Sequence, residues 1–430
     1  MQQKQQRFNW AVPFFSLWTG QALSLLGSRI GGFALVWWMT ETTGSAVVLS
    51  IGTILAFLPQ IVLGPIIGVL IDRWNRRRVM IVSDTIVAIG SVGLALLFWL
   101  DQVQLWHVYL MTFIGATGGT VQAFTMIAST TLMVPEKHLT RVQGANQTLQ
   151  GVMNIAAPPL GALLMGFLPI HLILELDVLT ALFAIVPLFF IRVPQPEPTV
   201  QTKEAEATTF WDDVQAGIRY IWRWPGLLGL LVLGMIMNFL ITPSLVLLPI
   251  LVTDHFGGGV VQLGWLEAAF GFGILGGGIL IGVWGGFQRK VVTIAVGAIG
   301  FGFSTVIIGL APVYAFWLAW GALFVSGAMN ALINAPFMAL LQTRIAPDMQ
   351  GRVFTIFNSG IQVLMPVGLI AAGFLSDWMD VRIWFVGGGI IATIVMSTAL
   401  FIPAIMKIED QNVDTDKPTI AIGAKPLATS

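Results

Sequence analysis

A short charged stretch between two long apolar segments constrains this chain more than any other feature. Residues 68–78 read GVLIDRWNRRR and carry one acid and four arginines. Residues 46–71 contain no ionisable side chain, and residues 79–100 contain only Asp84. An α-helix crosses the hydrocarbon core of a bilayer in about 20 residues. The sequence therefore predicts a tight turn between two membrane-spanning helices.

The composition extends this interpretation to the whole chain. Of its 430 residues, 56% are hydrophobic and 10% are charged, which is more apolar surface than a soluble domain buries. The net charge of zero argues against a nucleic-acid partner. The chain has no cysteine, which excludes disulfides, thiol nucleophiles and thiolate metal sites. The first apolar segment is too long for a signal peptide, so we expect an uncleaved span.

The apolar segments predict an all-α membrane protein with twelve transmembrane helices in two six-helix pseudo-repeat bundles. The predicted spans are residues 11–39, 46–71, 79–100, 106–134, 147–168, 171–191, 226–252, 261–286, 291–310, 313–342, 353–376 and 383–406. Basic loops stay on the cytoplasmic side during insertion. With both termini in the cytoplasm, 19 of the 21 Lys and Arg residues fall on that side, and Arg29 and Arg382 are the exceptions. We therefore expect a multi-pass protein of a bacterial cytoplasmic membrane, with a cytoplasmic N-terminus and C-terminus.

Sequence marks in the first half recur in the second. Residues 68–78 correspond to residues 282–290, GVWGGFQRK, and Pro159 corresponds to Pro366. Parallel halves with a substrate held between them are a transporter architecture. The predicted domains are a six-helix bundle at residues 1–192, a cytoplasmic linker with an amphipathic helix at 193–225, a second bundle at 226–406 and a disordered cytoplasmic tail at 407–430.

The sequence offers little support for an enzyme. Its four histidines, His107, His138, His171 and His255, lie at predicted helix ends and loops, and no H-E-x-x-H motif is present. No nucleophile and base pair is visible. We expect no enzymatic activity, no metal site and no cofactor.

The turn at residues 68–78 resembles the signature loop of the major facilitator superfamily, G-x-x-x-D-R-x-G-R-R, with Asn75 in place of the second glycine. The segments ETTGSAVVLS, FLPQIVLGPIIGVLIDR, LELDVLTA, QRKVVTI and GRVFTI resemble the macrolide-efflux (Mef-type) branch of drug:proton antiporters. The resemblance covers nearly the whole chain. It implies export of small amphipathic, macrolide-type compounds by alternating access, in exchange for protons, by a monomer in the lipid bilayer. A passive or proton-coupled facilitator, or a lipid flippase of the same fold, stays open as the alternative.

For the signature loop, the resemblance implies a gate. The implied gating residues are Gly68, Asp72, Arg73, Arg76 and Arg77. Asp72 would face the N-terminus of the helix that begins at residues 351–353, because backbone N–H groups and the helix dipole there favour an anion. This contact would close the two halves on the cytoplasmic side. The alternative is that the arginines only set the topology of the chain.

Five ionisable residues lie inside predicted spans, where a charge costs about 2.5 to 3.5 kcal/mol. They are Arg29, Asp84, Glu175, Asp177 and Glu267. Glu267, among apolar neighbours, is the first candidate for proton coupling, unless it reaches the membrane interface. Asp177 is the second, because it matches the Mef-type pattern, with packing against a neighbouring helix as its alternative. Glu175 is a weaker candidate, because two residues apart on a helix point to nearly opposite sides.

Arg29 and Asp84 receive separate predictions. Arg29 is the mid-membrane cation of the predicted spans, and Gly115 stands where related exporters carry a buried arginine. Arg29 is therefore expected to lie near an acid or to hold an anionic group, and extension along the lipid is the alternative. Asp84 lies near the arginine cluster and the positive end of its own helix, so a structural ion pair is predicted.

Amide side chains at helical spacing predict the walls of a substrate cavity. The candidates are Asn330, Asn334, Asn358, Gln362, Gln150, Asn154, Asn238 and Gln21. Such amides can instead form hydrogen bonds between helices, each worth about 0.6 kcal/mol on average.

Overall fold

The computed structural model describes residues 10–191, 193–195, 210–345 and 349–409. Within these ranges, the side chains of residues 64–66, 68–73, 140, 210–214, 216, 351 and 355 lie outside the description. The described part contains twelve helical segments that are long and apolar enough to cross a membrane. The predicted all-helical, twelve-span fold is therefore confirmed.

The N-terminal half consists of six long helices. They are α1 (Ala11–Thr43), α2 (Ala46–Arg73), α3 (Arg76–Trp99), α4 (Leu105–Met133), α5 (Glu136–Phe167) and α6 (Ile170–Phe190). Gly44 ends α1 in a left-handed conformation with φ of 57°, which glycine adopts without a Cβ clash. Asn75, which departs from the signature loop, caps α3, since its side chain accepts a hydrogen bond from the Arg78 backbone N–H at 3.1 Å.

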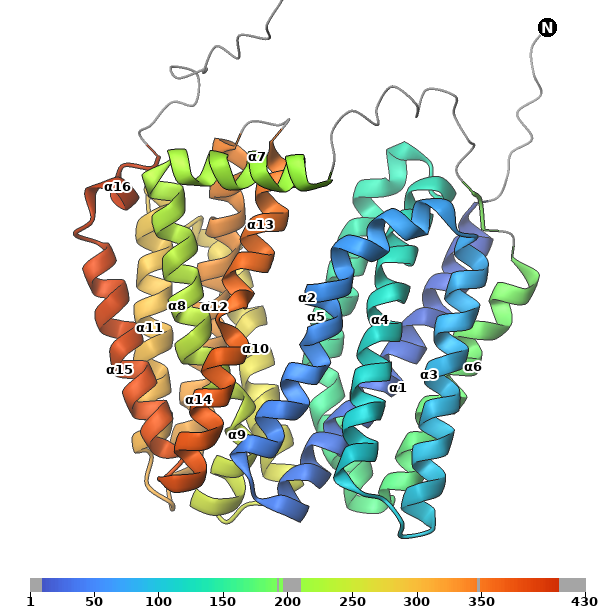
Figure 1. Cartoon of the computed structure of the whole chain (residues 1–430). Helices are drawn as coiled ribbons and strands as arrows, with labels where there is room; N and C mark the ends of the chain where they lie inside the picture. Colours follow the sequence, from blue (N-terminus) through green and yellow to red (C-terminus); the bar gives the residue numbers. More distant parts are fainter. Residues whose placement is uncertain (1–9, 192, 196–209, 346–348, 410–430) are drawn as a thin grey trace, which may run out of the picture.

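The C-terminal half follows α7 (Phe210–Arg223). Its helices are α8 (Pro225–Val246), α9 (Leu248–Ile250) with the π turn Leu251–His255, α10 (Val260–Trp284), α11 (Lys290–Leu310), α12 (Phe316–Arg344), α13 (Gln350–Val363), α14 (Met365–Trp378), α15 (Arg382–Ala399) and α16 (Pro403–Met406). Figure 1 shows the two halves side by side, with α7 across one end of the C-terminal half.

Four predicted spans differ from the observed helices. The span at 383–406 breaks after Ala399, and α16 begins beyond the break at Pro403. The helix that contains the predicted span 147–168 begins earlier, at Glu136, because a helix can extend beyond its apolar residues. The span at 226–252 breaks after Val246, close to Pro243 and Pro249. The span at 353–376 breaks at Leu364, before Pro366, because proline cannot donate the next hydrogen bond of the helix.

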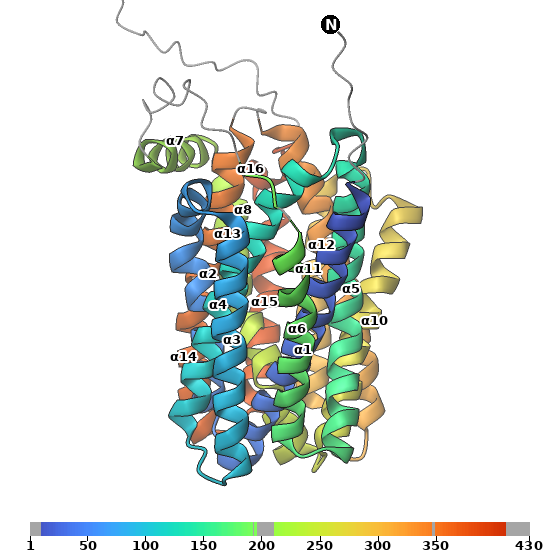
Figure 2. The ribbon, with the colours of Figure 1, turned by 90° about the vertical axis from the view of Figure 1, so that its right-hand side faces the viewer.

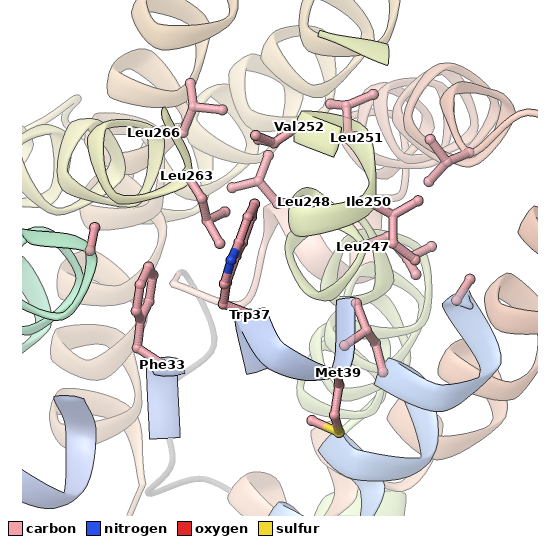
Figure 3. Close-up of a cluster of buried hydrophobic side chains, with 14 of the residues drawn as sticks. Phe33, Trp37, Met39, Leu247, Leu248, Ile250, Leu251, Val252, Leu263 and Leu266 are labelled. Atoms are coloured by element: carbon pink, nitrogen blue, oxygen red, sulfur yellow. The ribbon is translucent and has the colours of Figure 1, made fainter. Parts of the chain in front are cut away.

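Among the described residues, the two halves share a hydrophobic core at one end of the molecule. There, Trp37 of α1 lies beside Leu248 of α9 and Leu263 of α10, and Phe33 and Met39 belong to the same buried cluster (Figure 3). At the other end, which carries α7, one buried cluster lies within the C-terminal half and another within the N-terminal half. We call these the joined end and the terminal end. The ribbons of the two halves diverge towards the terminal end (Figure 1). Figure 2 shows the N-terminal half from its outer side, with the C-terminal half behind it.

Candidate transport site

The halves meet closely where α5 packs on α10. Two glycines of α10 make this approach possible, because a Cβ on Gly271 would lie 3.1 Å from Ile155 Cα and one on Gly264 would lie 3.4 Å from Pro158 O. Glu267 lies between these glycines, three residues from Gly264 and four from Gly271, and so on the same face of α10. The sequence thus places a carboxyl in the contact between the halves.

Glu267 and Arg29 line one cavity of about 500 Å³ between the halves. Its walls come from α1 and α5 on one side and from α8, α9, α10 and α12 on the other. Phe33, Leu248 and Leu323 of its lining also belong to the shared core at the joined end. The cavity therefore lies against the apolar closure of the joined end and holds one acid and one base from opposite halves.

Arg29 binds side chains of the neighbouring helix. Its guanidinium donates hydrogen bonds to Asn154 Oδ1 and to Gln150 Oε1, the latter at 3.0 Å. Its Nε is buried and has no acceptor in the described part of the chain. Arg29 therefore does not extend along the lipid, the alternative considered from the sequence. Arg29 also lines the cavity that contains Glu267.

A second cavity, of about 390 Å³, lies within the N-terminal half among α1, α3, α4, α5 and α6. It contains the other two buried acids. Asp177 is 7% exposed and accepts hydrogen bonds from Ser28 Oγ at 2.8 Å and Ser91 Oγ at 3.0 Å. Its carboxyl therefore joins α6 to α1 and α3, as the packing alternative predicted.

Asp84 has a different partner from the one predicted. Gln21 Nε2 donates to Asp84 Oδ2 at 3.0 Å. Among the described side chains Asp84 forms no ion pair, so the predicted pairing with an arginine is not observed there. The physical reason is direction, since Asp84 lines the cavity towards α1 while Arg77 is directed to the end of α6. Glu175 is exposed, on the side of α6 opposite to Asp177.

The predicted cavity amides divide into two groups. Gln21 and Gln150 line the cavity of the N-terminal half, and Asn154 lines the cavity between the halves. The other five form hydrogen bonds within their own helices: Asn334 Nδ2 donates to Asn330 O, Gln362 Nε2 donates to Asn358 O, and Asn238 Oδ1 accepts from Thr242 Oγ1. These contacts do not assign them a role in the cavity.

The signature loop is described only in part. The structure does not describe the side chains of Asp72 and Arg73 or the surroundings of Gly68 and Gly351. Arg76 Nη1 donates to Ala128 O of α4 at 2.7 Å. Arg77 donates to Leu188 O and Phe189 O at the C-terminus of α6, where the helix dipole favours a cation. Both arginines thus hold helix ends within the N-terminal half, and the gate involving Asp72 stays a prediction.

One polar contact between the halves was missed from the sequence. Asp377, at the C-terminal end of α14, accepts hydrogen bonds from Ser45 Oγ at 2.8 Å and from the Ala46 backbone N–H at 2.7 Å. It therefore caps the N-terminus of α2 from the opposite half, which is a favourable position for an anion. No motif in the sequence marked this contact, because it joins residues more than 330 positions apart.

Two six-helix halves, joined at one end around an internal cavity with charged walls, define a polytopic membrane transporter. The family model of the Major Facilitator Superfamily matches residues 17–247 and 237–428. Macrolide efflux protein A of Streptococcus pyogenes is 33% identical over 93% of this chain and 97% of its own. Multidrug efflux pump Tap of Mycolicibacterium fortuitum is 26% identical over 89% of this chain and 94% of its own.

The fold is also shared with a solved transporter. The xylose transporter XylE from E. coli, in an inward open conformation, superposes with a TM-score of 0.65 at 13% identity, over 90% of this chain and 95% of its own. The chain belongs to the major facilitator superfamily, and its sequence is of the Mef type.

Proposed function

We propose that the protein exports amphipathic, macrolide-type compounds from the bacterial cytoplasm in exchange for protons. The names of its relatives, a macrolide efflux protein and a multidrug efflux pump, support this substrate class. A passive or proton-coupled facilitator of a non-drug substrate, or a lipid flippase, is the competing function. The protein acts as a monomer in the cytoplasmic membrane, with both termini inside and no cofactor.

The single observation that carries the proposal is the cavity shared by Glu267 and Arg29. Because these residues come from opposite halves, any rocking of one half against the other changes their separation. In the described structure the joined end is sealed by apolar side chains. With the predicted topology, that end faces the outside and the diverging end faces the cytoplasm, where a substrate enters.

The proton acts through the charge of Glu267. While this carboxyl is ionised, it attracts Arg29 across the cavity and favours the joined arrangement. The joined arrangement therefore releases the proton of Glu267 towards the cytoplasm. In the opposite arrangement Glu267 lies farther from Arg29 and takes up a proton from outside, and the neutral carboxyl returns to the joined arrangement. Each charge that crosses the membrane gains about 2.3 kcal/mol per 100 mV of potential. Asp72, in this proposal, closes the terminal end in that opposite arrangement by facing the helix N-terminus at residues 351–353.

Export measurements with a matched pair of carboxyl variants test this proposal. Glu267→Gln removes the titratable group and should reduce uncoupler-sensitive macrolide export by an efflux-deficient bacterium at least 10-fold. Glu175→Gln removes an exposed carboxyl of α6 and should leave export at the parental level. The purified variants should retain macrolide binding, which separates loss of coupling from loss of folding.

Two results would contradict the proposal. If Glu267→Gln exports like the parent, Glu267 is not the coupling group. If uncouplers leave export by the parent chain unchanged, the exchange for protons is wrong and a passive facilitator is favoured.

A further inference from the structure

The cavity of the N-terminal half has acids on its walls and no base. Asp84 and Asp177 line it, and the described lining contains no Lys, Arg or His. Arg29 bonds the Gln150 side chain on this wall, but its guanidinium lines the cavity between the halves. A carboxylate within a membrane is costly unless a positive charge compensates it. The described residues that line this cavity do not supply the compensating positive charge.

The two carboxyls differ in how many of their oxygens accept a hydrogen bond. Both oxygens of Asp177 already accept a serine hydroxyl. Asp84 accepts from Gln21 through Oδ2 alone, and its Oδ1 has no partner in the described part of the chain. Asp84 therefore retains an acceptor for a ligand, whereas Asp177 is satisfied by its neighbours.

The remaining walls suit an organic cation. Trp18 lines the cavity, and its indole N–H donates to Asn146 Oδ1 at 2.6 Å, which fixes the ring on the wall. Indole rings attract cations at their faces. Gln122 also lines the cavity and adds an amide to its wall. About 390 Å³ is space for a sizeable organic group rather than a bare ion.

The space in this cavity depends on glycines of α4. No atom lies within 4 Å of the position that a Cβ would take on Gly115 or on Gly119. Both residues line the cavity, so a side chain at either position would occupy it without displacing a helix.

From these walls we infer that the cavity of the N-terminal half binds the charged end of a lipophilic monovalent organic cation, with Asp84 as its anionic contact. This inference rests on the proposed export function. It narrows the substrates to compounds that carry a cationic group. Their apolar part then extends towards the cavity between the halves, where Glu267 couples transport.

Binding of a charged and an uncharged form of one compound to the purified full chain tests the inference. The probes are tritiated propranolol, a secondary amine protonated at neutral pH, and its uncharged N-acetyl derivative, measured by equilibrium dialysis. We expect at least 10-fold tighter binding of the amine. Asp84→Asn and Gly115→Leu should each weaken amine binding at least 10-fold.

Two control variants separate these effects from general damage. Gly93→Leu places the same bulk at another open position, on the exposed side of α3 outside this cavity, and Glu175→Gln removes an exposed carboxyl. Both should bind the amine like the parent. If Asp84→Asn does not fold, Gly115→Leu, whose folding is checked by gel filtration, decides alone.

Several outcomes overturn the inference: no saturable amine binding, equal binding of the two probes, or parental binding by Gly115→Leu. Its failure is distinguishable from failure of the proposed function. Charge-independent binding combined with Glu267-dependent macrolide export would reject the cation cavity alone. Charge-selective binding without uncoupler-sensitive export would reject the proton exchange alone.

Discussion

Three acids within the spans have three different surroundings. Asp177 accepts two hydroxyl hydrogen bonds, Asp84 accepts one amide hydrogen bond, and Glu267 has no hydrogen-bond partner in the described part of the chain. Replacing a buried carboxyl whose oxygens both accept hydrogen bonds leaves its donors unpaired and lowers stability. A carboxyl without such partners can gain or lose a proton without breaking a hydrogen bond. These surroundings separate a residue that holds helices together from a candidate for coupling.

At this scale we predict that Asp177→Ala destabilises the N-terminal half. Interhelical hydrogen bonds in membranes contribute about 0.6 kcal/mol each on average, so losing two should lower the free energy of unfolding by about 1 kcal/mol or more. Unfolding by titration with SDS measures the effect. Glu175→Ala, at the exposed side of the same helix, is the control and should unfold like the parent. Equal stability of all three proteins would reject the structural role of Asp177.

Among the helices, α10 packs closely on both halves of the molecule. Gly264 and Gly271 face α5 of the opposite half, while Gly273 and Gly277 face α12 of the same half. Close packing of glycine faces is the usual way for membrane helices to associate. One face of α10 therefore packs within its own half, and another packs against the opposite half.

We predict that Gly271→Ala opens the contact between α5 and α10. The added Cβ would lie 3.1 Å from the Ile155 backbone, so the two helices must separate. Spin labels at Lys137→Cys and Thr343→Cys, both exposed at the terminal end, should then move closer together than in the parent. Gly278→Ala is the matched control on the same helix, because no atom lies within 4 Å of its Cβ position. An unchanged label distance in Gly271→Ala would show that this contact does not set the balance between states.

Over the whole molecule, α2 links the two ends of the transporter. Its N-terminus is capped by Asp377 of the opposite half at the joined end. Its other end carries Asp72, predicted to cap a helix of that half when the terminal end closes. With the Asp72 contact that we propose, each end would pair an acid of one half with a helix N-terminus of the other.

The absence of native cysteine allows a direct test of this arrangement. Ser45→Cys combined with Asp377→Cys replaces a contact in which the side-chain oxygens lie 2.8 Å apart. Oxidation, or a short bifunctional thiol reagent, should lock the joined end and stop export, and a reductant should restore it. Each single-cysteine variant should be insensitive to the oxidant. Undiminished export by the cross-linked protein would exclude opening of the joined end during transport.

The sequence by itself determined the twelve spans and the family, because long apolar segments and turn residues act locally and need no tertiary contact. It also separated Glu175 from Asp177, because helical spacing fixes their relative direction. Which acid faces which cavity was decided by the tertiary structure alone. Asp84 meets Gln21, Arg29 meets Gln150, and Glu267 shares a cavity with Arg29 only because helices distant in sequence are packed together. No periodicity within one helix encodes such a partner, since the partner depends on the rotation and tilt of both helices.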